Sequence, residues 1–284
     1  MSGFPQVAPS VLSADFGVLR GQVSLVQEAG AEVIHVDVMD GHFVPPLSMG
    51  PPVCEALREM GLHLEVHLMV EHPETTQIAA FAEAGAGTII IHAEATPAID
   101  YALGLIREHG CLAGLAVNPA TPIDFFEQVE VDLALCMTVN PGWGGQGFIA
   151  GSNEKIARMR AVLPEATVLE VDGGIDAQTA GPAVAAGAQR LVAGSAIFGS
   201  ADPAAAYRAI LEAAEAGCAR GPRPGGRARR AGRRAEPRRP RIRFRPAAGR
   251  RRPPARTSSP REPGRRAAKR KRPASRARGR ARPG

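Results

Sequence analysis

Cysteine is scarce in this 284-residue sequence, which contains only Cys54, Cys111, Cys136 and Cys218. They lie far apart and form no CxxC pair, so the sequence favours neither a disulfide framework nor a structural zinc site. No window reaches the roughly 18 apolar residues of a membrane span. The N-terminus also lacks the basic segment and long apolar run of a signal peptide. We therefore expect reduced thiols in a cytoplasmic protein without a membrane partner.

Basic residues are rare in the first 218 positions and concentrated in the rest. Residues 1–218 hold 8 Lys or Arg and 26 Asp or Glu, a net charge of −18, whereas residues 219–284 hold 27 and 2, a net charge of +25. Apart from alanine, the second segment has only Ile242 and Phe244 as apolar residues, too few to build a core. The sequence therefore predicts one folded domain over 1–218 and a disordered basic tail over 219–284.

Three interpretations of this tail are open. Its charge would bind nucleic-acid phosphates in a salt-dependent way, and KRKR at 269–272 resembles basic targeting patches, but its single aromatic residue, Phe244, gives little support for base stacking. It could instead be a solvated segment without function. It could also come from out-of-frame reading of a GC-rich gene, because 56 of its 66 residues are Ala, Gly, Pro or Arg. We favour the last two, so a nucleic-acid partner is expected only if the tail is genuine.

The acidic body alternates β-branched runs with Ala-, Leu- and Glu-rich segments that Gly, Pro, Asn or Asp separate. The eight predicted strands are residues 7–13, 33–39, 63–70, 88–93, 112–118, 133–140, 167–172 and 190–194. The eight predicted helices are residues 16–29, 50–60, 74–84, 97–109, 122–129, 152–163, 177–186 and 202–216. Eight βα units in about 218 residues favour an α/β fold of the single (β/α)8 TIM-barrel type over a doubly wound open sheet. In such a barrel the chemistry lies at the carboxyl ends of the strands.

Polar residues interrupt three of the predicted strands. His35 and Asp37 share one face of the second strand, His67 repeats the pattern in the third, and Asp172 ends the seventh. Such groups are costly to bury unless they are paired or bind metal. The set could hold one divalent Zn, Fe, Mn or Co ion, among which the ligand types do not choose. A satisfied polar cluster is the alternative, and four such residues on three strand ends favour the metal.

The remaining histidines are weaker candidates for the site. We expect structural or surface roles for His42, His63, His72, His92 and His109.

Glycine-rich loops follow the last three predicted strands. Residues 142–147 hold four glycines, Gly173 and Gly174 follow the seventh strand, and Gly194 and Ser195 follow the eighth. Backbone N–H groups in such loops can approach a phosphate closely, and loops seven and eight are the usual phosphate site of a barrel. Ordinary turn glycines are the alternative, which three adjacent loops disfavour. Because these loops lack Lys and Arg, backbone amides would provide most of the binding.

A metal, two carboxylates and a phosphate site together predict chemistry on a small sugar phosphate. Two acids on different strands can act on opposite faces of one carbon, as an epimerase requires: one removes the proton α to a carbonyl, and the other returns a proton from the opposite side. A Schiff-base lyase would need a lysine near the strand ends. Lys155, the only lysine of residues 1–218, falls in a predicted helix, which disfavours that reaction.

Six segments carry a resemblance to a known family. In chain order they are PSVLSADFG, HVDVMDGHFVP, VHLMV, VNPGWGGQGF, VDGGI and VAGSAIF, and they closely resemble ribulose-phosphate 3-epimerases, the metal-dependent barrel enzymes of the pentose phosphate and Calvin pathways. The resemblance covers about residues 5–217. It implies interconversion of D-ribulose 5-phosphate and D-xylulose 5-phosphate through an enediolate. A hexulose 6-phosphate 3-epimerase would share the same residues, and the oligomeric state, including a homo-oligomer, is left open.

The resemblance also implies roles for individual residues. The metal ligands would be His35, Asp37, His67 and Asp172, with Asp37 as proton acceptor and Asp172 as proton donor in one direction. The pentulose 5-phosphate substrate would contact Ser10, His67, Gly142, Trp143, Gly144, Gly145, Asp172, Gly173, Gly174, Gly194 and Ser195. The enediolate region would be lined by Met39, Met69 and Met137. Two positions depart from the family pattern: Trp143 stands where Phe is usual, and Glu65 where Asp often precedes VHLMV.

Overall fold

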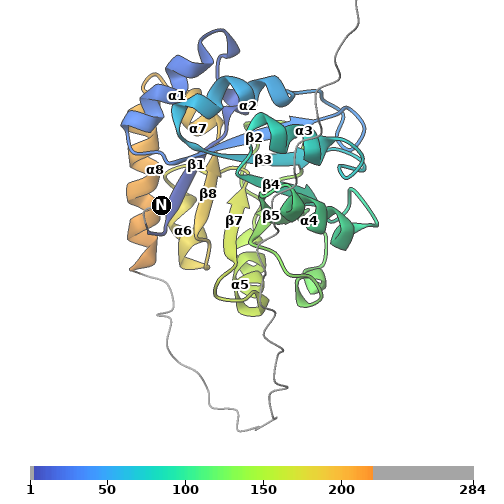
Figure 1. Cartoon of the computed structure of the whole chain (residues 1–284). Helices are drawn as coiled ribbons and strands as arrows, with labels where there is room; N and C mark the ends of the chain where they lie inside the picture. The colour runs from blue at the N-terminus through green and yellow to red at the C-terminus, as the bar shows by residue number, and fades with distance from the viewer. Residues whose placement is uncertain (1–2, 220–284) are drawn as a thin grey trace, which may run out of the picture. The chain divides into compact units, whose positions relative to one another are not determined.

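The computed structural model describes residues 3–219, in which eight parallel strands form one sheet (Figure 1). The strands are β1 (Gln6–Pro9), β2 (Val33–Met39), β3 (His63–Met69), β4 (Thr88–His92), β5 (Leu112–Val117), β6 (Leu133–Met137), β7 (Val168–Asp172) and β8 (Arg190–Ala193). Their order in the sheet is β1-β8-β7-β6-β5-β4-β3-β2. A parallel bridge between Ser10 and His35 joins the two edges and closes the sheet. The predicted (β/α)8 barrel is therefore confirmed.

Helices surround the strands on the outside of the barrel (Figure 1). The α-helices are α1 (Leu19–Glu28), α2 (Pro51–Leu57), α3 (Gln77–Ala84), α4 (Ile99–Glu108), α5 (Ser152–Val162), α6 (Ala180–Ala185), α7 (Ser195–Phe198) and α8 (Pro203–Cys218). Local signals fix their ends. Asp202 accepts a hydrogen bond from the N–H of Ala205 at the start of α8, and Gly85 ends α3 in the left-handed conformation at φ 109°.

Short 3-10 turns replace part of the predicted structure. They are η1 (Val11–Ser13), η2 (Phe16–Val18), η3 (Arg58–Met60) and η4 (Asp124–Glu127). The first predicted strand, 7–13, is too long, because the Ser10 side chain accepts a hydrogen bond from the N–H of Leu12 and turns the chain into η1. The α-helix predicted over 122–129 is wrong: η4 buries only Phe126, which is too little apolar surface to hold a longer helix.

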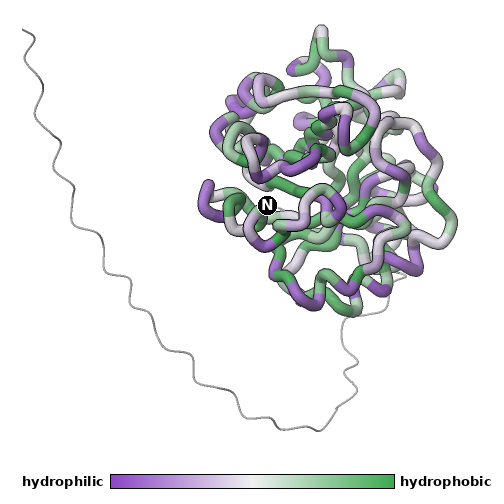
Figure 2. The backbone as a smooth tube through the Cα atoms, turned by 90° about the vertical axis from the view of Figure 1, so that its right-hand side faces the viewer, coloured by the Kyte–Doolittle hydropathy of each residue, from purple (hydrophilic) through white to green (hydrophobic). Residues whose placement is uncertain are grey.

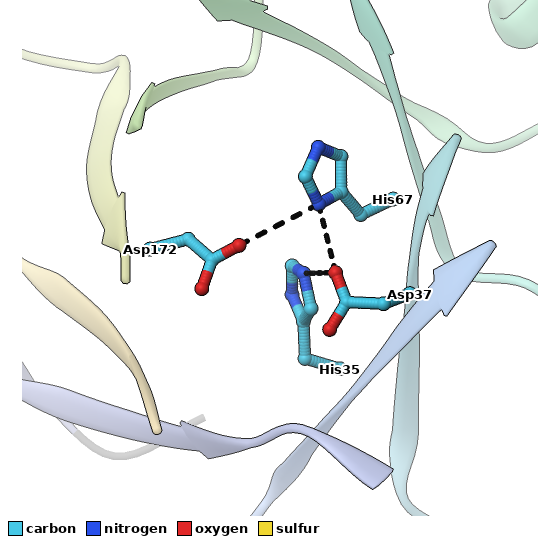
Figure 3. Close-up of side chains that lie close together, drawn as sticks. All are labelled: His35, Asp37, His67 and Asp172. Atoms are coloured by element: carbon cyan, nitrogen blue, oxygen red, sulfur yellow. Dashed lines mark hydrogen bonds and ion pairs between the residues drawn. The ribbon is translucent and has the colours of Figure 1, made fainter. Parts of the chain in front are cut away.

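Successive side chains of a strand point to opposite faces of the sheet. Figure 2, coloured by hydropathy, shows hydrophobic stretches of the chain running through the interior of the domain. Along β2, Ile34, Val36 and Val38 belong to the apolar core that extends from the strands to the helices. His35 and Asp37 point to the barrel interior (Figure 3). The polar face predicted for this strand is thus the inner face of the barrel.

The barrel interior is apolar on one side and polar on the other. The apolar residues lie mainly on β4–β6 and are Ile90, Ala116, Leu133, Leu135, Met137 and Val139. The packing there is close, since a Cβ on Gly114 would lie 2.7 Å from Cγ1 of Ile90. Most of the buried polar residues of the interior come from the other strands, and β4 adds two; they are Gln6, His35, Asp37, Glu65, His67, Glu170 and Arg190, with Thr88 and His92 on β4. The polar half carries the candidate site.

Three expectations concern the rest of the chain. Cys54, Cys111 and Cys136 are buried free thiols, and Cys218 is an exposed one. Among the described residues, no helix has the length and apolar character that crossing a bilayer requires. Helix α8 ends at Cys218, and residues 220–284 lie outside the described part of the chain. The basic tail over 219–284 and its binding of nucleic acid therefore stay predictions.

Candidate metal and active site

Four side chains from three strands meet at the carboxyl-terminal mouth of the barrel (Figure 3). His35 and Asp37 come from β2, His67 from β3 and Asp172 from the end of β7. The parallel register places Asp37 opposite His67, and strand alternation turns both inward. One possible ligand atom from each of the four lies within 4.8 Å of the others. The structure thus brings together the four polar residues that the sequence pattern indicated.

The distances among these atoms suit a cation. His67 Nδ1 lies 2.9 Å from Asp37 Oδ1 and 3.7 Å from Asp172 Oδ2, and His35 Nε2 lies 3.3 Å from Asp37 Oδ1. His35 Nε2 is buried and has no hydrogen-bond partner among the described residues. Two histidine nitrogens and two carboxylates, with one of the nitrogens unpartnered, are ligands typical of zinc or another divalent transition metal. The residues present therefore fit such an ion.

The two aspartates have opposite electrostatic environments. Burial favours a higher pKa for Asp37, but the neighbouring His35 and His67 outweigh it and hold that pKa well below its usual range. Ser10 Oγ also donates to Asp37 Oδ2, at 2.5 Å. Burial and the negative charge of Asp37 raise the pKa of Asp172 to about 7. Near neutral pH one carboxylate is ionised while the other holds a proton for much of the time, as an acid and base pair requires.

A buried ion pair lies beneath the four residues and orients His35. Arg190 Nη1 donates to Glu65, and its other nitrogens donate to Gln6 Oε1 at 3.0 and 3.2 Å. Glu65 Oε1 lies 3.1 Å from His35 Nδ1. Because an ionised carboxylate only accepts hydrogen bonds, this contact places a ring hydrogen of His35 on Nδ1. Nε2 is then the ring nitrogen that faces Asp37.

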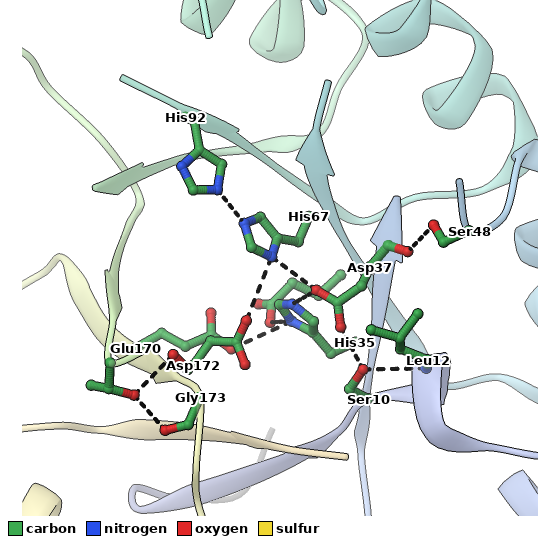
Figure 4. A network of polar contacts seen from close by, with 12 residues as sticks. Ser10, Leu12, His35, Asp37, Ser48, His67, His92, Glu170, Asp172 and Gly173 are labelled. Atoms are coloured by element: carbon green, nitrogen blue, oxygen red, sulfur yellow. Dashed lines mark hydrogen bonds and ion pairs between the residues drawn. The ribbon is translucent and has the colours of Figure 1, made fainter. Parts of the chain in front are cut away.

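Sequence reasoning missed several members of this polar interior. Gln6 lies just before the first predicted strand, whereas Glu170 and Arg190 lie in predicted strands that are otherwise mostly apolar. Glu65 stands out in the sequence only as a departure from the family pattern. His92 is fully buried, which excludes a surface position, and its Nε2 lies 2.8 Å from His67 Nε2 (Figure 4). Strand alternation could have identified Glu170, because it lies two residues before Asp172 and therefore on the same face of β7. His42, His72 and His109 are exposed and His63 is half-buried, as expected for surface or structural residues.

A pocket opens above the four residues. Its lining includes the three methionines Met39, Met69 and Met137. Every residue for which substrate contact was predicted lines it, except His67. These residues are Ser10, Gly142, Trp143, Gly144, Gly145, Asp172, Gly173, Gly174, Gly194 and Ser195. Four separate loops and strand ends thus converge on one space beside the aspartates.

Glycine is required where the two central loops meet. Gly173 and Gly174 have positive φ values of 121° and 65°. A Cβ on Gly173 would lie 2.4 Å from Cγ2 of Val139, and one on Gly174 would lie 2.3 Å from the backbone nitrogen of Phe148. The loop after β7 therefore packs directly against the loop after β6. Any side chain here would separate the two loops that border the pocket.

Known proteins are similar to this chain in sequence and in fold. The model of the ribulose-phosphate 3 epimerase family matches residues 6–198. Ribulose-phosphate 3-epimerase of Bacillus subtilis is 47% identical over 204 residues, which are 69% of this chain and 94% of that protein. The Escherichia coli K12 protein of the same name is 44% identical over 213 residues, 72% of this chain and 92% of that one. The solved structure of 3-hexulose-6-phosphate synthase from Salmonella typhimurium has a TM-score of 0.60 at 16% identity and covers 74% of this chain and 98% of its own, a likeness of fold alone.

The buried pair of Glu65 and Arg190 generates a prediction about stability. Arg190→Met leaves the fully buried Glu65 carboxylate without its cation, and we expect a loss of about 3–5 kcal/mol in the free energy of unfolding. Urea unfolding followed by circular dichroism measures it. The matched control is Arg20→Met, which breaks an exposed pair with Glu59 and should cost no more than about 1 kcal/mol. Equal losses for the two variants would contradict the role given to Arg190.

Proposed function

Because the chain belongs to the ribulose-phosphate 3-epimerase family, we propose that it interconverts D-ribulose 5-phosphate and D-xylulose 5-phosphate by epimerisation at C3. The observation that carries the proposal is the pair of aspartates that face each other from β2 and β7 (Figure 3). Inversion at a carbon needs one group to remove a proton from one face and a second group to deliver a proton to the other. Asp37 and Asp172 have the placement and the opposite protonation preferences for this work.

In one direction of the proposed reaction, the ionised Asp37 accepts the C3 proton and the substrate becomes an enediolate. Asp172 then donates its proton to the opposite face of C3, and the two exchange roles in the reverse direction. His35, Asp37, His67 and Asp172 would hold one divalent cation (Zn, Fe, Mn or Co), which supplies a positive charge that stabilises the developing oxyanions. Ser10, which donates to Asp37 Oδ2 and lines the pocket, would hold that carboxylate in place and contact the substrate.

The glycine loops would bind the substrate phosphate at the other end of the pocket. Gly142–Gly145, Gly173–Gly174 and Gly194–Ser195 all line the pocket, and no Lys or Arg does so within the described residues. Backbone N–H groups are therefore the donors available there. Met39, Met69 and Met137 would surround the reacting carbons with an apolar wall that contains no competing proton donor.

Asp172→Asn tests the acid and base roles. We expect kcat to fall by at least about 100-fold, because the amide cannot exchange a proton with C3. Asp37 should still remove a proton from one of the two epimers, so that epimer should exchange its C3 hydrogen with D2O without being converted. NMR of the two pentulose phosphates in D2O measures both effects.

The control for this variant is Asp176→Asn. Asp176 accepts backbone N–H groups of Gln178 and Thr179 and does not line the pocket, so its variant should keep normal turnover. Normal turnover by Asp172→Asn would refute the assignment of Asp172. Loss of exchange for both epimers in that variant would refute independent action by Asp37.

Gly174→Ala tests the binding role of the loops. The new Cβ would meet the backbone of Phe148, so the loop after β6 must move away from the pocket. We expect KM for the phosphorylated substrate to rise by about 10-fold or more, which corresponds to the loss of one or two hydrogen bonds to a charged group. Gly151→Ala is the control, because Gly151 has a similar φ of 88° but open space around it and lies outside the pocket lining. Equal KM values for both variants would argue against the loop contact.

A further inference from the structure

A chain of hydrogen bonds leads from His67 to the outside of the barrel. His67 Nε2 lies 2.8 Å from His92 Nε2, and the two fully buried rings are stacked with centroids 4.9 Å apart (Figure 4). His92 Nδ1 lies 3.2 Å from Glu94 Oε2, in the loop that follows β4. None of the roles derived so far uses His92 or Glu94, although their contacts continue directly from a candidate ligand.

The carboxylate of Glu94 is held in a fixed position. Its Oε1 accepts the N–H of Asn118 at 2.8 Å and the hydroxyl of Thr121. The loop that carries these donors is held by Lys155, whose Nζ donates to the carbonyls of Asn118, Pro119 and Thr121 at 2.6, 3.1 and 3.0 Å. Burial favours a higher pKa for Glu94, but hydrogen bonds from His92, Thr121 and Asn118 lower it to about 2. Glu94 is therefore an acceptor that carries no hydrogen near neutral pH.

The direction of each hydrogen bond in this chain follows from that fixed end. Because the Glu94 carboxylate only accepts, His92 must carry a hydrogen on Nδ1. In the ring form with a single hydrogen, His92 Nε2 is then an acceptor. The contact between the two Nε2 atoms then requires the hydrogen of His67 to be on Nε2. Nδ1 of His67 is left bare, 2.9 Å from Asp37 Oδ1 and 3.7 Å from Asp172 Oδ2. Because a bare nitrogen and an ionised carboxylate cannot hydrogen-bond to each other, this tautomer suits a cation that both atoms bind.

We propose that Glu94 is a positioning residue for metal binding, which acts through His92 to fix His67 in the tautomer whose bare Nδ1 faces Asp37 and Asp172. A histidine binds a metal through a nitrogen without hydrogen, so the chain prepares His67 as a ligand. The inference rests on the metal site of the proposed function and is independent of the substrate. It also gives Lys155 a role: it holds the loop that fixes Glu94.

Glu94→Gln tests the proposal by exchanging one oxygen for an NH2 group. The amide oxygen must stay on the side of Asn118 and Thr121, which donate hydrogen bonds, so the NH2 group faces His92 Nδ1 and donates to it. Every hydrogen bond in the chain then reverses, and the hydrogen of His67 moves to Nδ1. We expect the Kd of the full-length chain for Zn²⁺, measured by chelator competition, to rise about 10- to 100-fold.

Two further measurements separate this role from a merely structural one. In metal-free protein, ¹⁵N NMR of the histidine rings should show His67 with its hydrogen on Nε2 in the wild type and on Nδ1 in Glu94→Gln. In a His92→Phe background, which breaks the chain, Glu94→Gln should cause no additional loss of Zn²⁺ affinity. Glu74→Gln is the matched control, since Glu74 also contacts a histidine and a threonine hydroxyl, but its partner His72 lies exposed in the loop after β3 and not buried beside His67. Its Kd should equal that of the wild type.

The outcomes distinguish this proposal from the proposed function. A wild type that binds Zn²⁺ together with a Glu94→Gln variant whose Kd changes less than twofold would overturn the positioning role and leave the metal site intact. An equal loss of affinity in the wild-type and His92→Phe backgrounds would show that Glu94 only supports its loop. Should His92→Phe fail to fold, an unchanged His67 tautomer in Glu94→Gln would overturn the proposal on its own. A wild type that binds no divalent ion would refute the metal site itself.

Discussion

The concentration of negative charge inside one half of the barrel is the constraint on which the rest of the site depends. Asp37, Glu65, Glu170 and Asp172 all point to the interior, and buried carboxylates are unstable unless positive charge or protons balance them. Beneath the four central residues the charge balance is permanent, because Arg190 forms an ion pair with Glu65. Burial and the negative charge of Glu65 raise the pKa of Glu170 well above its usual value, which keeps that group protonated. At the mouth of the barrel, an exchangeable divalent cation would balance the charge of Asp37 and Asp172.

His35 and His67 each link an aspartate at the mouth of the barrel to a buried side chain that is not one of the four central residues. His35 contacts the acid Glu65 through one nitrogen and turns the other toward Asp37. His67 contacts His92 through one nitrogen and turns the other toward Asp37 and Asp172. In both cases a group outside the four central residues contacts the ring nitrogen that faces away from the aspartates. The geometry of the mouth therefore depends on residues that would touch neither a metal nor a substrate.

Much of the fold and the four central residues could be predicted because strand alternation is a local property of the sequence. His35 and Asp37 interrupt an aliphatic strand, and their spacing alone places them on one face. The pairing of Glu65 with Arg190 was not predictable in this way, since the two residues are 125 positions apart and meet only when the sheet closes. His92 was undervalued for a related reason: a single histidine at the end of an apolar strand gives no signal until a neighbouring strand brings His67 beside it. The turn after Ser10 depended on one side-chain hydrogen bond that no pattern reveals.

The same charge balance accounts for the absence of cationic side chains from the described lining of the pocket. A lysine or arginine near Asp37 or Asp172 would form an ion pair with them, which would lower the raised pKa of Asp172 and occupy the position that suits a metal ion. Backbone N–H groups cannot compete in this way, because they carry no net charge and are fixed by the loop conformation. Glycines such as Gly173 and Gly174 let the loops approach each other closely enough to present those groups. In the proposed function, binding the phosphate through backbone groups and reacting at a carbon through carboxylates would thus be electrostatically separate tasks.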